Sequence, residues 1–255
     1  MCFPTKGENH HSGVKNELTI ISTMNETPEA PLNKYFRDKF KVSSVRWEHR
    51  GGTRLKEDAV VFLDESGSRK ISIKNHKSGT FDWVNSSKSV PLELKKLIRD
   101  FKTKHKENVF QEVIPDEIRH ECSSVLSNYL DLMSCDDLRE LLENEYEKQP
   151  PYLLVNDVRK RELVLFKKAI LKNSFLLNGR GRFVLKKTRA VTSRQLWIYT
   201  HDGLKINTNL RIRCVLNNGV NALFSDKGAV PCIKIQQDSV DSFLDSVKVK
   251  ITNSY

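Results

Sequence analysis

Apolar residues at helical spacing open the chain. The pattern over residues 12–24 predicts an amphipathic helix, with Ser12 as a suitable N-cap and Glu17 among its polar positions. One face of this helix carries Val14, Leu18, Ile21 and Met24. Residues 26–31 contain two prolines and end the helix, and residues 32–40 can form a second short helix.

Short strand-like runs follow. Residues 42–47 predict a strand, Gly51 and Gly52 turn the chain, and the apolar run 59–63 is followed by 70–74 after a turn at 64–68. The last two runs are short enough to form an antiparallel hairpin. Asp58 and Lys74, at the ends away from the turn, are therefore expected to lie side by side.

The middle of the chain has helical periodicity, and the C-terminal part is strand-like. Apolar residues between Pro91 and Gln149 recur at helical spacing in three groups, and Pro150–Pro151 ends this region. Residues 157–173 are predicted to form one more helix. Strands are predicted at residues 183–185, 196–199, 210–215, 220–224 and 232–235.

These elements predict an α/β fold with a helical middle and a β-rich C-terminal part. We expect residues 1–150 to form a catalytic region with a helical extension. Residues 151–255 are expected to form a second domain or an elaboration of the first.

Composition favours a nucleic-acid partner. The chain has 43 Lys and Arg against 32 Asp and Glu, a net charge of +11, so phosphate backbones are natural counterions. The alternative is a solvated basic surface. Without a run of about 20 apolar residues or an apolar leader, we expect a soluble, cytoplasmic protein with no membrane partner. The 5 cysteines are scattered, without zinc spacing, and suit a reducing compartment.

Asp58 and Lys74 are the candidate catalytic pair. Hydrolysis of a phosphodiester needs a divalent cation to offset the phosphate charge and a group that positions and deprotonates the attacking water. Carboxylate and carbonyl oxygens suit Mg²⁺, and a lysine can serve the water. The chain has no phosphate-binding GxxxxGK[ST] and no GxGxxG, GxSxG or HExxH motif, so the commoner nucleotide-hydrolysing, redox and hydrolase families lack support.

The surrounding pattern resembles the PD-(D/E)XK superfamily of restriction-endonuclease-like nucleases. In that family an acid at the start of one strand is followed by a turn and by acid-X-Lys on the adjacent strand. Asp58 and Ser72-Ile73-Lys74 stand in these places, and Glu17 matches a glutamate that the family commonly adds from the preceding helix. The resemblance covers roughly residues 10–88. It implies a mixed sheet flanked by helices and a Mg²⁺ cofactor, with Mn²⁺ as a substitute.

Ser72 departs from the family pattern, which has an acid at this position. A second carboxylate must then come from elsewhere, and Glu17 is the first choice. Glu57 is excluded because successive strand residues point to opposite faces. By analogy with the family, the carbonyl of Ile73 would also face the metal. The alternatives are a decayed site, a solvated Glu17, and Lys74 as an edge-strand lysine that prevents aggregation.

A further set of residues is expected to contact nucleic acid. Residues 75–85, directly after Lys74, mix phosphate-binding side chains with aromatic ones, as in proteins that grip a backbone or stack on an unpaired base. Trp83 in this segment could equally be a core residue. The expected contacts are Arg54, Lys77, Thr80, Asn85 and His11.

The leading hypothesis is a Mg²⁺-dependent endonuclease that resembles type II restriction enzymes and cuts double-stranded DNA at a specific sequence. Asp58 and Glu17 would hold the metal, Lys74 would activate the water, and Ser72 would support them. A homodimer is expected, because one site cleaves one strand. Alternatives are a nuclease selective for branched or damaged DNA, an inactive nucleic-acid-binding protein of this fold, and a basic scaffold. C-terminal recognition is expected from Lys186, Lys187, Arg189, Arg194, Arg211 and Arg213.

Overall fold

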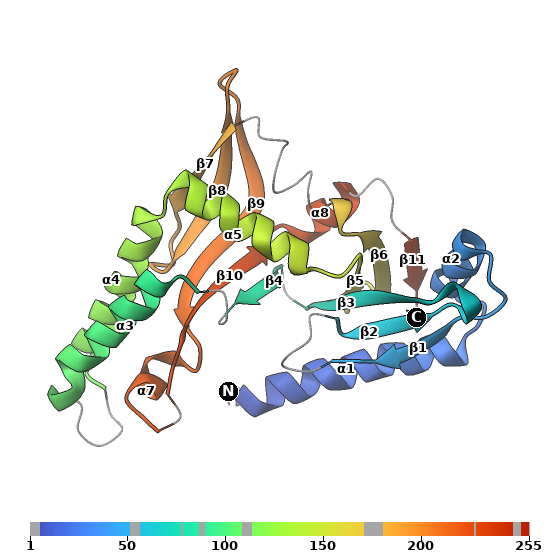
Figure 1. The fold of residues 1–255 in the computed structure, drawn as a ribbon, viewed down its shortest axis with the longest axis horizontal. Helices are drawn as coiled ribbons and strands as arrows, with labels where there is room; N and C mark the ends of the chain where they lie inside the picture. Colours follow the sequence, from blue (N-terminus) through green and yellow to red (C-terminus); the bar gives the residue numbers. More distant parts are fainter. Residues whose placement is uncertain are drawn as a thin grey trace. The chain divides into compact units, whose positions relative to one another are not determined.

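The computed structural model divides the chain into two compact units, each described here by itself (Figure 1). Unit 1 consists of Met1–Phe81, Glu143–Leu176 and Val240–Tyr255, and unit 2 of Asp82–Leu142 and Leu177–Ser239. The structure describes residues 6–51, 57–77, 79–86, 90–108, 114–170, 181–226, 228–246 and 251–254.

Unit 1 is built on a 6-stranded mixed sheet with strand order β1-β2-β3-β5-β6-β11. The strands are β1 (Arg46–His49), β2 (Ala59–Phe62), β3 (Ser68–His76), β5 (Tyr152–Asp157), β6 (Glu162–Lys167) and β11 (Ile251–Ser254). All neighbouring strands are antiparallel except β3 and β5, which are parallel. Parallel neighbours need a long crossover, and here the crossover contains the first segment of unit 2.

Helices α1 (Lys6–Glu26), α2 (Pro31–Phe40) and α8 (Val240–Ser246) complete unit 1. Figure 1 shows α1 running alongside β1. Ile21 and Met24 of α1 belong to one buried cluster with Trp47 of β1 and Ile71 and Ile73 of β3. Because side chains alternate along a strand, Ser72, Lys74 and His76 point to the opposite face of the sheet.

Unit 2 is built on a 5-stranded sheet with order β4-β10-β9-β8-β7. Its strands are β4 (Phe81–Ser86), β7 (Gly181–Lys187), β8 (Ser193–Thr200), β9 (Lys205–Leu216) and β10 (Pro231–Gln237). Its helices are α3 (Leu92–His105), α4 (Asp116–Leu132) and α7 (Gly219–Leu223), and the division between the units falls within α5 (Cys135–Lys148). Figure 1 shows α3 and α4 on one side of this sheet.

The predicted α/β class, with a mixed sheet flanked by helices, a helical middle and a β-rich C-terminal part, is confirmed. The hairpin of residues 59–74 is also confirmed, since Ala59 pairs with Ile71. The expected boundary near Pro150–Pro151 falls within unit 1, because β5, which follows it, pairs with β3.

Several local predictions are wrong. Residues 157–173, predicted to form a helix, contain the strand β6. Leu163 and Leu165 of this strand belong to the core cluster of unit 1, and Val164 and Phe166 are buried on the opposite face of the sheet. Residues 220–223 lie in the short helix α7, with Phe224 as its C-cap, instead of a strand. Helix α1 begins at Lys6, so Ser12 lies inside it. Leu18 is 48% exposed, and Glu17, not Leu18, shares the sheet-facing stripe with Ile21 and Met24.

Within the part of the chain that the structure describes, we find no helix with the length and apolar character needed to span a membrane.

Candidate active site

The β2–β3 hairpin sets the position of Asp58. Gly67, with a φ of 81°, takes the left-handed backbone conformation that the hairpin connection requires. At the other end, the N–H of Asp58 donates to the carbonyl of Ile71 (2.9 Å), and the carbonyl of Asp58 accepts the N–H of Arg50 (3.0 Å). Asp58 is thus held between β1 and β3 at the point where β2 begins.

The carboxylate of Asp58 is fixed by β3. Its Oδ2 atom accepts the backbone N–H of Ile73 at 2.6 Å and the hydroxyl of Ser72 at 3.0 Å. The Ser72 side chain is fully buried. Ser72 therefore orients the carboxylate that the sequence places at the start of the strand, and does not itself add a negative charge.

Glu17 approaches from α1. Its Oε2 atom lies 3.0 Å from Nε2 of His49, and its side chain is 16% exposed. Burial raises the pKa of Glu17, and the negative charge of Asp58 raises it further, while His49 and Lys74 act in the opposite direction. Asp58 and Lys74, which are distant from Glu17 in sequence, are thus within electrostatic range of it in unit 1.

Three asparagines tie α1 to the sheet beside these residues. Asn16 donates its amide to Oδ1 of Asn75, and Asn156 of β5 donates to Oδ1 of Asn16 (3.0 Å) and of Asn75 (3.3 Å). Asn16 precedes Glu17, and Asn75 follows Lys74. The network fixes the helix against β3 and β5 at the turn that carries Glu17.

Sequence reasoning missed both His49 and this network. His49 could have been found, because it lies two residues after Trp47 on β1 and therefore points to the same face of the sheet, the face that meets α1. No sequence pattern pointed to Asn156, because it lies 140 positions from its partner Asn16 in the chain.

A partly buried cluster includes His76, which lies on the same face of β3 as Lys74. His76, Asp157 and Asp241 each offer a ligand atom within 4.8 Å of the others. Nδ1 of His76 lies 3.4 Å from Oδ2 of Asp157, and both side chains are fully buried. Such a group could hold a cation, but Asp241 already binds Arg159 (2.9 Å) and Lys160 (3.0 Å). The bonds to Lys160 and Arg159 lower the pKa of Asp241 to about 2.

The expected nucleic-acid contacts are only partly described. Lys77 is exposed directly after β3, and Thr80 is half-buried before β4. Arg54 and the side chains of His11 and Asn85 lie outside the described residues. Trp83 is a core residue, 2% exposed, and its Nε1 donates to Gln237 (3.1 Å). Glu57 pairs with Lys70 (2.8 Å).

Arg194 cannot serve as the surface contact that was expected of it. Its side chain is 1% exposed, and its guanidinium donates to Asp131 (2.7 Å), to the hydroxyl of Ser127 (2.7 Å) and to three backbone carbonyls. A guanidinium enclosed by this many acceptors holds β8 to α4. Lys187 also pairs with Asp131, at 3.3 Å, from an exposed position.

No family model and no curated protein matches the chain. Among solved structures, the restriction endonuclease MspI in complex with its cognate DNA is similar, with 14% identity over 76% of this chain and 71% of that chain and a TM-score of 0.28. A likeness this distant transfers no residue role, so the chemistry of the site rests on its own geometry.

Proposed function

We propose that this chain is a Mg²⁺-dependent endonuclease that hydrolyses phosphodiester bonds in double-stranded DNA. The observation that carries the proposal is a pair of acids within electrostatic range of each other and of Lys74: Asp58, bonded to Ser72 and Ile73, and Glu17, beside His49. A carboxyl group whose pKa is raised by burial and by a neighbouring acid is costly to ionise, and a divalent cation bound beside it lowers that cost. The net charge of +11 favours a polyanionic substrate.

The donor set fits a hard cation. Asp58, Glu17 and the carbonyl of Ile73 would supply oxygen ligands, which Mg²⁺ prefers and Mn²⁺ also accepts. Ile73 directs its N–H towards Asp58, and in a sheet the carbonyl of a residue points to the same side as its N–H. Mg²⁺ bound there would offset the negative charge of the scissile phosphate.

The remaining roles would fall to side chains of the chain itself. Lys74 would hold the attacking water, and its positive charge would favour loss of the water proton to solvent. The water oxygen would bond to phosphorus as the bond to the leaving oxygen breaks, and the leaving oxygen would take up a proton from solvent. Asp58, locked by Ser72 and Ile73, would stay in one orientation through the reaction. His49 would keep the carboxylate of Glu17 in place. Lys77 and Thr80, and by expectation Arg54, Asn85 and His11, would contact the DNA.

The test is cleavage of a long duplex DNA with Mg²⁺ or Mn²⁺ by the native chain, Asp58→Ala and Lys74→Ala. Lys70→Ala is the matched control, because Lys70 lies on the same strand at its exposed far end. We expect discrete fragments from the native chain and Lys70→Ala, and none from the other variants. Equal cleavage by Asp58→Ala would refute this site. A native mass of two chains in light scattering would support the expected homodimer.

One observation favours a second candidate, an inactive DNA-binding protein of the same fold. Ser72 stands where the resembling family has an acid, and its buried hydroxyl adds no charge to the site. Calorimetric titration with Mn²⁺ separates the two. The nuclease should bind Mn²⁺ and lose that binding in Asp58→Ala, whereas an inactive protein should show no binding that depends on Asp58.

A further inference from the structure

The sheet of unit 2 has one apolar face and one polar face. On β8, Leu196 and Ile198 are buried, while Gln195, Trp197 and Tyr199 between them are half-buried. On β9, Leu210, Ile212 and Cys214 are buried, and Arg211 and Arg213 alternate with them. The helices α3 and α4 bury Leu94, Ile98, Leu126 and Leu130 in the same unit. The opposite surface is termed the polar sheet face.

Strand pairing arranges the polar sheet face in rows. One row across β7, β8 and β9 reads Arg182, Tyr199, Lys205, and the row beside it places Trp197 next to Asn207. The following row reads Lys186, Gln195, Arg211, Gln236 across four strands. Neighbours in a row are about 4.8 Å apart and the rows about 7 Å apart. Aromatic rings thus stand at one end of the face and amides in its middle.

Cations surround the two aromatic rings. Nζ of Lys186 lies 3.8 Å from the ring centroid of Trp197 and 5.5 Å from that of Tyr199. Nζ of Lys205 lies 5.5 Å and the guanidinium of Arg182 5.8 Å from the Tyr199 ring. Stacking platforms flanked by positive charges are the combination that binds bases together with their phosphates.

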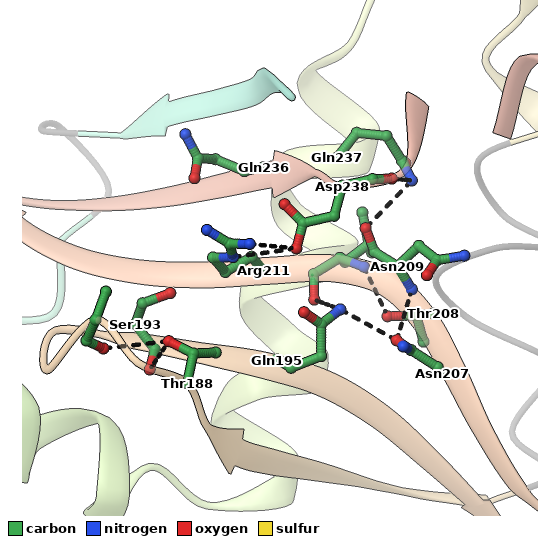
Figure 2. Close-up of polar contacts among 12 residues, drawn as sticks. Thr188, Ser193, Gln195, Asn207, Thr208, Asn209, Arg211, Gln236, Gln237 and Asp238 are labelled. Atoms are coloured by element: carbon green, nitrogen blue, oxygen red, sulfur yellow. Dashed lines mark hydrogen bonds and ion pairs between the residues drawn. The ribbon is translucent and has the colours of Figure 1, made fainter. Parts of the chain in front are cut away.

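Gln195 and Asn207 are held in place by hydrogen bonds within the protein, as Figure 2 shows. Gln195 donates its amide to Asn207 (3.1 Å) and to the carbonyl of Leu210 (2.9 Å). Its amide hydrogens are therefore used, and Gln195 offers its oxygen as an acceptor. Asn207 Oδ1 also accepts the N–H of Asn209 (2.9 Å), so Asn207 offers its amide hydrogens as donors. Neither side chain has to be reordered to meet a base edge.

Arg211 is fixed in the same way. Its guanidinium binds Oδ2 of Asp238 through Nε (3.0 Å) and Nη2 (2.9 Å), leaving the remaining N–H groups for a ligand. Asp238 is 13% exposed, and Arg211 is its ion-pair partner among the described residues. A guanidinium oriented by a carboxylate is a ready donor for base or phosphate oxygens.

We propose that the polar sheet face binds single-stranded nucleic acid. Trp197 and Tyr199 stack on bases, Lys186 and Lys205 bind the flanking phosphates, and Gln195, Asn207 and Arg211 bond to base edges. This binding surface is additional to the proposed nuclease centre and does not depend on its activity.

Two magnitudes favour a single strand over a duplex. Five strands span about 19 Å, whereas the major groove is about 12 Å wide, so the face does not fit into a duplex groove. Stacking of a base on an aromatic ring is stronger than the attraction between that ring and an exposed cation. A base therefore displaces Lys186 from Trp197, and the released ammonium can bind a phosphate.

The test is binding of a short fluorescent oligothymidine to the full chain in EDTA, with oligouridine and the matching duplex as further probes. We expect the single strands to quench tryptophan fluorescence more strongly than the duplex, and their binding to weaken as the salt concentration rises. Trp47 and Trp83 are each 2% exposed, so quenching of tryptophan fluorescence would report Trp197. Trp197→Leu should weaken binding about tenfold, and Trp197→Phe should retain most of it.

Lys186→Ala should weaken binding more than Lys96→Ala, a control at an exposed lysine on α3. Asp58→Ala should bind as the native chain does, which separates this surface from the proposed active site. The proposal is overturned if the duplex quenches tryptophan fluorescence as strongly as the single strands, or if Trp197→Leu and Lys186→Ala both bind the single strands like the native chain while circular dichroism shows them folded.

Discussion

The backbone N–H of Ile73 donates a 2.6 Å hydrogen bond to Oδ2 of Asp58, so the carboxylate at the start of β2 is held by the strand that carries Lys74. The hydroxyl of Ser72 reaches the same oxygen. The carboxylate thus keeps its orientation through a backbone contact that no side-chain substitution at position 73 removes. This relationship makes position 72 the most informative place to alter the site.

Ser72→Asp should destabilise the protein in EDTA and be rescued by Mg²⁺. The new carboxylate would be buried beside that of Asp58, and like charges in one site oppose each other's ionisation. A divalent cation removes that repulsion. Ser72→Ala, the control, should lose only one hydrogen bond, about 0.5–1.5 kcal/mol, with or without metal. Thermal melts with EDTA and Mg²⁺ check both, and equal melting temperatures of Ser72→Asp in the two buffers would argue against a metal here.

Glu17→Gln should stabilise the metal-free protein at neutral pH and abolish cleavage. The pKa of Glu17 is raised in the folded state, chiefly by burial, so the folded protein holds this proton more tightly than the unfolded chain. Ionisation of Glu17 therefore costs stability as pH rises through the folded pKa, and the full cost persists above it. Glutamine does not ionise and avoids this cost.

Melting temperatures of the native chain and Glu17→Gln in EDTA, measured from pH 4 to pH 8, check this. The advantage of Glu17→Gln should be largest at pH 8 and disappear towards pH 4. Glu117→Gln, at an exposed position on α4, should show no such trend. A lower melting temperature for Glu17→Gln at pH 8 would mean that the His49 contact outweighs burial.

The elements nearest the site were predictable because the residue pattern that specifies each of them lies within a short segment of the sequence. Alternation of apolar residues over 59–74, with turn residues between, sufficed to place Asp58 beside β3. The location of Glu17 on the helix that meets the sheet was also predictable, although the stripe was assigned to Leu18. A carboxylate on a buried stripe breaks the apolar pattern, and hydrophobic periodicity alone therefore assigns it to solvent.

Contacts between distant segments could not be predicted. The parallel pairing of β3 with β5 joins Ile71 to Tyr152 across the inserted segment of unit 2, and no local pattern encodes that pairing. Val158, Leu163, Phe166 and Ile170, with basic residues between them, predict a helix over residues 157–173. In the fold, both faces of β6 are buried, so its strand-like alternation is lost.

Arg194→Ala should destabilise unit 2 by about 3 kcal/mol, because it leaves the acceptors around a buried guanidinium without their donor. Arg189→Ala, at an exposed position in the preceding loop, should change stability by less than about 0.5 kcal/mol. Urea unfolding followed by circular dichroism compares the two. Equal midpoints would return Arg194 to the set of surface residues available to nucleic acid.

Alkylation of the cysteines should report the opening of unit 2. Burial raises the pKa of Cys214 to about 12 and that of Cys122 to about 11, from a model-compound value of 9.0. Only the thiolate reacts, so at pH 8 Cys214 offers about a thousandfold fewer thiolates than a free thiol. Cys232 is also buried, whereas Cys135 is half-buried, with its Sγ 3.1 Å from the N–H of Phe183.

Among the four cysteines that the structure describes, iodoacetamide labelling at pH 8, followed by peptide mass mapping, should therefore modify Cys135 first and the other three only as the unit opens. Arg194→Ala should accelerate labelling of Cys122, Cys214 and Cys232 in proportion to its loss of stability, and Arg189→Ala should not. Labelling of Cys214 at the rate of Cys135 in the native chain would show that the apolar side of this sheet is open to solvent, because a thiol enclosed between the sheet and its helices reacts only after they separate.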